Sequence, residues 1–206
     1  MISKIFTIAA LIGMGIAAAT PSTHSLNLAA LQALQATEAP RLAASGIVLH
    51  HTEALPDGYF VEIYGSVENN TSPAVQQHQH IARAPLSVAG KLGCGMEKIE
   101  CDWSPTYGVK EEVTERLIRH LFDRKDWTSR QPRSFCLYGK HSRACVSWNR
   151  DVGSFPWAFL APATQRIWGR CGEGHSGRDH NVVLRLLGGW LYRCIGQCLS
   201  NRPDGC

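Results

Sequence analysis

The chain has 206 residues, of which 18% are charged and 44% hydrophobic, and a formal net charge of +4 at pH 7. This composition is that of an ordinary globular protein, and it excludes a wholly disordered chain, a collagen and a protein with several membrane spans. Eight cysteines add a second expectation, because small secreted domains use disulfides in place of part of a hydrophobic core. Composition therefore indicates a globular protein of an oxidising compartment, but it does not identify a reaction or a ligand.

Residues 1–19 have the pattern of a secretory signal peptide. A single lysine precedes an apolar run over residues 5–16, and three alanines at 17–19 form a site for signal peptidase. A membrane anchor is disfavoured, because about twelve apolar residues span roughly 18 Å, well short of a bilayer core near 30 Å. We expect cleavage after Ala19 and an exported, soluble mature chain.

Cysteine placement divides the rest of the chain into an N-terminal segment, residues 20–93, and a cysteine-rich domain, residues 94–206. Export favours disulfides over free thiols or zinc thiolates. Cys194 and Cys198 have a spacing that a zinc site can use, but no second close pair completes a tetrahedral set, so we expect neither a metal nor a cofactor. The cysteines expected to form disulfides are Cys94, Cys101, Cys136, Cys145, Cys171, Cys194, Cys198 and Cys206.

The two halves of the chain also differ in charge. Residues 1–101 hold five basic and seven acidic side chains, whereas residues 102–206 hold sixteen and ten, a surplus of six positive charges. A solvated surface accounts for this surplus, and so does attraction to an anionic partner such as a cell-wall polymer. Nucleic acid is a poor fit, because the arginines lack the interleaved aromatic residues of a strand-binding surface. We expect an extracellular partner, either an anionic polymer or a host protein, and no membrane span.

The N-terminal segment is predicted to be loosely organised, in part a linker. A short helix over residues 26–36 is interrupted at Pro40, and one strand covers residues 58–66. Residues 69–85 are polar and contain prolines, as expected of a loop, and Asn69 begins a glycosylation sequon. Removal of residues 20–93 as a propeptide is an alternative, although no dibasic processing site precedes Cys94.

The cysteine-rich domain begins with the firmest helix and an expected hairpin. Apolar residues recur at helical spacing over residues 111–127. Residues 134–138 and 143–148 are predicted strands joined by a four-residue loop. Symmetric pairing sets Cys136 opposite Cys145, close enough for a disulfide, although each could equally reach a helix.

A second helix and a second hairpin complete the expected fold. The helix lies within residues 156–170, where Pro162 must kink or restart it. Residues 182–187 and 190–195 flank a Gly-Gly pair, a strong hairpin signal, and pairing sets Val183 opposite Cys194. The prediction is an α+β fold in which a small antiparallel sheet of two hairpins is packed by two helices and stapled by disulfides.

Apparent catalytic motifs lie in the wrong context. Glycines 172, 174 and 177 have dinucleotide-binding spacing, but they follow a helix instead of a strand. The triad residue types at 175, 176 and 179 lie within five positions, whereas real triads unite distant segments. The histidine pairs at 50–51 and 78 and 80 lie in the weakly structured segment and favour incidental surface positions. We therefore expect no catalytic, cofactor-binding or metal-binding residue.

One enzymatic alternative remains, a small secreted ribonuclease. Such an enzyme needs a histidine or glutamate base and an arginine that stabilises the pentavalent phosphate. The candidates are His141, His175, His180 and Arg178. No spacing among them requires this activity.

Four segments together resemble the fungal WD-like domain: residues 133–138, residues 145–148, Cys171 followed by Ser176-Gly177, and residues 198–206. The resemblance covers Cys101 to Cys206, and the terminal run is its most specific part. It implies a fungal source and secretion, and it implies no active site. Because Ala144-Cys145 stands where such proteins often have two cysteines, no disulfide pairing is carried over.

The leading hypothesis is a secreted, non-enzymatic effector, toxin-like or cell-surface interaction protein. Exposed tryptophans could contribute to its binding surface, although packing in the core is the default for each. The tryptophans are Trp103, Trp127, Trp148, Trp157, Trp168 and Trp190.

Overall fold

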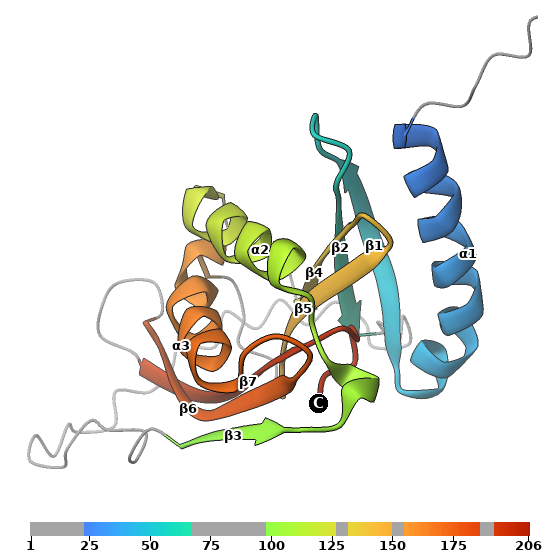
Figure 1. Ribbon diagram of the computed structural model, residues 1–206. Coiled ribbons are helices and arrows are strands. Elements are labelled where there is room, and N and C mark those ends of the chain that lie inside the picture. Colours follow the sequence, from blue (N-terminus) through green and yellow to red (C-terminus); the bar gives the residue numbers. More distant parts are fainter. Residues whose placement is uncertain (1–22, 67–97, 127–131, 150–154, 186–191) are drawn as a thin grey trace, which may run out of the picture.

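The computed structural model describes residues 23–66, 98–126, 132–149, 155–185 and 192–206, which form one seven-stranded antiparallel sheet with helices on both faces (Figure 1). The sheet order is β1-β2-β4-β5-β7-β6-β3. The strands are β1 (Ile47–Ala54), β2 (Phe60–Ser66), β3 (Ile99–Asp102), β4 (Pro132–Gly139), β5 (Ser142–Trp148), β6 (Ser176–Arg185) and β7 (Tyr192–Ser200). The helices are α1 (Thr23–Ala44), α2 (Glu111–Asp123) and α3 (Ala161–Cys171), with short 3-10 turns η1 (Pro105–Tyr107) and η2 (Trp157–Leu160).

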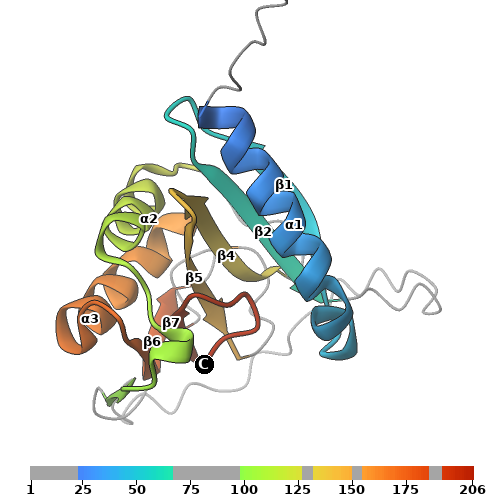
Figure 2. The same cartoon turned by 45° about the vertical axis from the view of Figure 1, so that its right-hand side comes forward.

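The helices lie in two separate layers. Figure 2 shows α1 along β1 and β2 on one side of the sheet, while α2 and α3 cover the other side. Strand β2 is buried on both faces, because its alternate side chains point into different cores: Phe60 packs with Leu31 of α1, and Val61 packs with the α2 and α3 core.

Helix α2 follows the predicted periodicity. Val113, Leu117 and Leu121 are buried on one face, and Phe122 on the other face is exposed. The helix begins at Glu111, as expected, and ends at Asp123, before the predicted end. Its final predicted residue, Trp127, lies outside the described residues.

The predicted hairpin of β4 and β5 is confirmed, with a shorter turn. Cys136 lies opposite Cys145, and a disulfide joins them across Cα atoms 4.0 Å apart. Gly139 and Ser142 still pair, so the turn comprises only Lys140 and His141. Both residues have positive φ, 48° and 60°, the backbone shape that matches the twist of a two-residue hairpin.

The second half of the domain also follows the sequence prediction. Strands β6 and β7 pair with Val183 opposite Cys194, and the Gly-Gly turn between them lies outside the described residues. Pro162 lies in the first turn of α3, directly after η2, where its missing N–H removes no helical hydrogen bond. Pro162 therefore starts a helix, and it does not kink one.

The structure corrects the prediction of a loosely organised N-terminal segment. Helix α1 runs through Pro40 to Ala44, and β1 pairs with β2, which in turn pairs with β4. Leu31 and Leu42, on either side of Pro40, are both buried, so tertiary packing outweighs the local effect of the proline. With β1 and β3 added, the sheet has seven strands where the sequence predicted two hairpins.

Disulfides connect the elements of the cysteine-rich half. Cys101 of β3 bonds Cys171 of α3, and Cys198 of β7 bonds Cys206 at the C-terminus. All six cysteines whose side chains the structure describes are paired. Cys94 and the side chain of Cys194 lie outside the described residues. In the part of the chain that is described, no helix has both the length and the apolar character needed to cross a bilayer.

Candidate functional site

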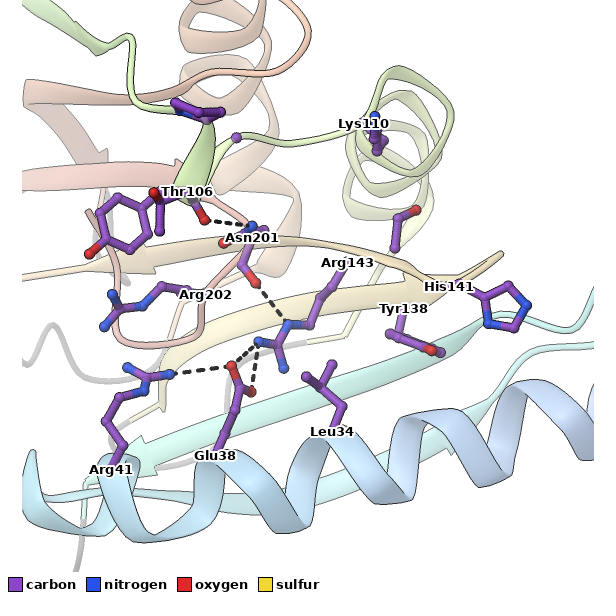
Figure 3. A pocket seen from close by; sticks show the side chains of 14 residues that line it. Leu34, Glu38, Arg41, Thr106, Lys110, Tyr138, His141, Arg143, Asn201 and Arg202 are labelled. Carbon is purple, nitrogen blue, oxygen red and sulfur yellow. Dashed lines mark hydrogen bonds and ion pairs between the residues drawn. The ribbon is translucent and has the colours of Figure 1, made fainter.

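A pocket of about 560 Å³ opens where four separate segments of the chain meet, and its size is within the range of small-molecule sites. Helix α1 forms one wall, the strands β4 and β5 with their turn form the floor, and the C-terminal loop (residues 201–205) with η1 forms the opposite wall. Figure 3 shows Arg41 and Arg202 at one end of the pocket and His141 at the other.

The walls are joined by a chain of ion pairs in which positive and negative groups alternate. Arg202 Nε lies 2.9 Å from Asp204 Oδ1, and Asp204 also pairs with Arg41 of α1. Arg41 reaches Glu38 Oε1 at 3.3 Å, and Glu38 lies 2.7 Å from Arg143 Nη2. We call this set the ion-pair chain: Arg202, Asp204, Arg41, Glu38, Arg143 and Glu62.

Arg143 of β5 is the buried centre of this chain, with only 5% of its surface exposed. Its Nε donates to the carbonyl of Asn201 at 2.9 Å, and Nη2 donates to Glu38. Its Nη1 lies 3.8 Å from Glu62 Oε2 and has no hydrogen-bond partner. Burial alone would lower the pKa of Arg143, but the charges of Glu62 and Glu38 outweigh burial and hold that pKa above its ordinary value. The guanidinium is therefore charged, and its Nη1 is buried beside the Glu62 carboxylate.

Glu62 of β2 is the second carboxylate that pairs with Arg143. Its carboxylate is fully buried, and Oε1 accepts hydrogen bonds from Gln35 Nε2 at 2.8 Å and from the Tyr64 hydroxyl at 2.6 Å. Burial and then the charge of Glu62 raise the pKa of Tyr64, so this hydroxyl stays protonated and donates. These two donors orient the carboxylate toward Arg143.

The C-terminal loop is held against η1 by polar and aromatic contacts. Asn201 donates from its backbone N–H to the Tyr107 carbonyl and from Nδ2 to the Thr106 carbonyl, both at 3.1 Å (Figure 3 shows the second bond). The Arg202 guanidinium lies 4.6 Å from the centre of the Tyr107 ring, a cation–π contact. The loop thus presents Asn201 and Arg202 to the pocket.

The lining of the pocket is predominantly cationic. Arg41, Lys110, Arg143 and Arg202 face it, and Glu38 is the acidic residue that lines it. Lys110 is exposed and belongs to none of the ion pairs formed by the described residues. Guanidinium and ammonium groups at such a site suit a carboxylate, sulfate or phosphate group of a ligand. Within the described residues, no cluster of three or more metal-ligating side chains occurs.

The structure separates the residues considered for a ribonuclease. His141 lines the pocket, whereas His175, His180 and Arg178 lie beside or on β6 and do not line it. His180 Nε2 lies 2.8 Å from Glu100 Oε2 on β3. The hydrogen bond from Lys98 and then that with His180 lower the pKa of Glu100 to about 2, so this carboxylate is ionised.

The other candidates from the sequence lie in varied surroundings. Ser176 is buried, and Asp179 pairs with Arg166 of α3 at 2.9 Å, while the ring of His175 lies 4.5 Å from that of Trp103. Trp103 is 66% exposed, and Trp148 and Trp157 are in the core. His50 and His51 are exposed on β1, Trp168 is half-buried, and the other residues named for these roles, His78, His80, Trp190 and Asn69, lie outside the described residues.

Sequence reasoning missed the pocket, because its residues come from four separate segments. The sequence does contain one signal of a buried ion pair at this site. Glu62 lies within the apolar strand sequence of residues 60–64, and a carboxylate in a strand buried on both faces needs a cationic partner. The sequence does not say which of its many arginines supplies that partner.

The fold and the pocket define a disulfide-stabilised α+β protein with a pocket whose charged lining residues are mostly cationic. The family model named Fungal WD-like matches residues 74–206, more than half of the chain. The chain therefore belongs to the fungal WD-like family, as the resemblance over its cysteine-rich half indicated. No curated protein and no solved structure matches it. The matched residues do not include α1, β1 and β2, which supply Glu38, Arg41 and Glu62.

The ion-pair chain makes stability depend on pH at Asp204. Burial is the largest influence and would raise the pKa of Asp204, but the hydrogen bond from Arg202, with the charges of Arg202 and Arg41, lowers it overall. A carboxyl whose pKa is lower in the folded than in the unfolded state contributes stability above the unfolded value, about 3.9, and loses that contribution as the pH falls further.

We therefore expect Asp204→Asn to lower the free energy of unfolding by about 1 to 2 kcal/mol at pH 7. The gap from wild type should narrow as the pH falls below about 4 and Asp204 becomes protonated in the folded protein. Urea denaturation of wild type and variant at a series of pH values measures this difference in the free energy of unfolding. Asp123→Asn, at the exposed end of α2, is the control and should change little at any pH. A gap of constant size across this range would contradict the assignment.

Proposed function

We propose that this protein is an exported, non-enzymatic binding protein whose cationic pocket takes an anionic group of an extracellular polymer. The observation that carries the proposal is the lining of the pocket, where Arg41, Lys110, Arg143 and Arg202 lie with Glu38 as the acidic residue. An anionic group of a ligand in this pocket would gain charge-assisted hydrogen bonds from these cations. Lys110 and Arg202 at the pocket wall would add attraction to the same group.

Export is supported by two independent features. Residues 1–19 have the pattern of a signal peptide, and disulfides persist mainly in oxidising compartments outside the cytosol. An exported binding protein of a fungal family would act as an effector, a toxin-like protein or a cell-surface interaction protein. In each role the disulfides would keep the binding surface intact outside the cell.

We further propose that the mature protein retains residues 20–93. Glu38 and Glu62, both in this segment, are the carboxylates that pair with Arg143. Removal of the segment would take away both counter-charges together with the helix and strand that cover Arg143, and it would uncover Tyr138 of β4, which packs with Leu31 and Phe60. Retention of the segment therefore fits the packing better than its removal as a propeptide.

The secreted species should begin at Thr20, carry a glycan at Asn69 and contain all later residues. Intact-mass and N-terminal analysis of protein from culture medium, before and after glycosidase treatment, measures all three features. A chain that begins near Cys94 would contradict retention of the segment. An unshifted mass after deglycosylation would contradict modification at Asn69.

Ligand binding should depend on the cations that line the pocket, among them exposed Lys110 and partly exposed Arg202. We expect Lys110→Ala and Arg202→Gln each to raise the Kd for oligogalacturonate, a polymer of carboxylates, about fivefold, which corresponds to roughly 1 kcal/mol. Calorimetric titration at low salt measures it. Lys125→Ala, an exposed cation outside the pocket, is the matched control and should leave the Kd unchanged.

Two further ligands test which chemical group the pocket binds. Polyphosphate tests whether the pocket prefers phosphate to carboxylate, and neutral glucan should bind to neither wild type nor variants. Loss of affinity in Lys125→Ala equal to that in Lys110→Ala would indicate attraction by net charge alone and contradict the pocket. Labelled RNA should remain intact with the wild type; cleavage that His180→Ala abolishes would contradict a non-enzymatic role and favour the ribonuclease.

A further inference from the structure

We infer that the Cys198–Cys206 disulfide assembles the binding pocket, so that the site is complete only in the oxidised, exported protein. This inference rests on the proposed function, since it concerns the regulation of the same pocket. The disulfide closes a short loop, with a sequence separation of 8, at the end of β7. That loop contains Asn201 and Arg202, which line the pocket, and Asp204, which with Arg202 forms one end of the ion-pair chain.

Hydrogen bonds inside the loop are mostly local and cannot by themselves fix its position. Ser200 Oγ accepts from the Arg202 N–H at 3.2 Å, and the Gly205 N–H donates to the Arg202 carbonyl at 3.4 Å. Arg202 pairs with Asp204 two residues away. These bonds join residues within the turn, so they do not fix the turn relative to the rest of the fold.

Few contacts tie the end of the loop to the rest of the fold. Gly205 has a φ of +92°, and a Cβ atom at this position would lie 2.8 Å from Ser147 Oγ, so the loop runs directly against β5. Beyond Asn201, the loop is attached by the cation–π contact of Arg202 with Tyr107, the ion pair of Asp204 with Arg41, the bond from Arg178 to the Cys206 carbonyl at 2.6 Å, and the disulfide. The disulfide is the covalent restraint among these attachments, and it limits how far the loop can move when the noncovalent contacts open.

The three described disulfides differ in access. Cys206 is exposed although its partner Cys198 is buried, Cys101 is half-buried with its partner Cys171 buried, and Cys136 and Cys145 are completely buried. Thiol–disulfide exchange requires a thiolate to reach a sulfur atom, so a small thiol attacks the C-terminal disulfide first. The other two bonds, which lie within the sheet and between β3 and α3, remain closed under the same conditions.

The redox step is an ordinary exchange with a low-molecular-weight thiol. One thiolate attacks Cys206 Sγ, the Cys198–Cys206 bond breaks, and Cys198 leaves as a thiolate that takes up a proton. A second thiol then releases Cys206 from the mixed disulfide, so two thiols are oxidised to one disulfide and two cysteines are reduced. During export the reverse step transfers two electrons from the cysteines to a small-molecule or protein disulfide.

Opening this bond frees the wall of the pocket. Arg202 and Asp204 are no longer held beside Arg41, and a ligand must order the loop before it can use Arg202. Affinity for an anionic polymer falls, while the sheet, both helical layers and the buried disulfides persist.

The test compares oligogalacturonate binding by oxidised wild type, wild type under mild dithiothreitol, and the double variant Cys198→Ser/Cys206→Ser. Alkylation and mass spectrometry identify which cysteines are reduced. We expect at least a tenfold higher Kd in the reduced protein and in the double variant, with cooperative thermal unfolding retained. Reoxidation should restore binding to wild type only.

The outcomes separate this inference from the proposed function. If oxidised wild type fails to bind oligogalacturonate and polyphosphate, the proposed function fails, and this inference fails with it. If oxidised wild type binds and the reduced protein binds equally well, this inference alone is overturned. Should the double variant not be secreted, selective reduction of the folded wild type decides the question, and binding that survives complete reduction of Cys198 and Cys206 refutes it.

Discussion

The arrangement of this protein depends on a buried arginine. Arg143 lies within β5 and faces away from the main core, and a charge in that position costs several kcal/mol unless counter-charges and hydrogen bonds surround it. Its counter-charges, Glu38 and Glu62, come from α1 and β2. The second layer of the fold therefore has an electrostatic as well as a hydrophobic basis, because departure of α1 from the sheet would break the ion pair of Glu38 with Arg143 and uncover the buried Glu62.

The same group connects the architecture to the pocket. From Arg143 the ion-pair chain continues through Arg41 to Asp204 and Arg202, so α1, the sheet and the C-terminal loop meet around a single polar space. Residues outside the family match supply one wall, and residues inside it supply the rest. The Cys198–Cys206 disulfide secures the last link of this chain. A pocket built in this way is complete only when distant segments and a covalent bond are all in place.

Local sequence signals predicted the helices and strands of the cysteine-rich half well, whereas they did not predict features that depend on contacts between distant segments. The helix at Glu111, the β4–β5 hairpin with Cys136 opposite Cys145, and the pairing of Val183 with Cys194 each follow from periodicity or turn chemistry within a few residues. Strand β1 was missed because most of its residues are exposed and a register shift interrupts its alternation, and α1 continues past Pro40 because packing, which no local pattern reveals, holds both sides. The pocket was missed for the same reason: Glu62 signals that a cation must be near, but only the fold brings Arg143 to it.

The most direct measurement is a double-mutant cycle on Glu38 and Arg143, in which the free energy of unfolding is obtained for wild type, Glu38→Gln, Arg143→Met and the double variant. If the ion pair holds α1 to the sheet, the loss in the double variant should be smaller than the sum of the single losses by at least about 1 kcal/mol. Losses that add, with no coupling between the two side chains, would contradict the account.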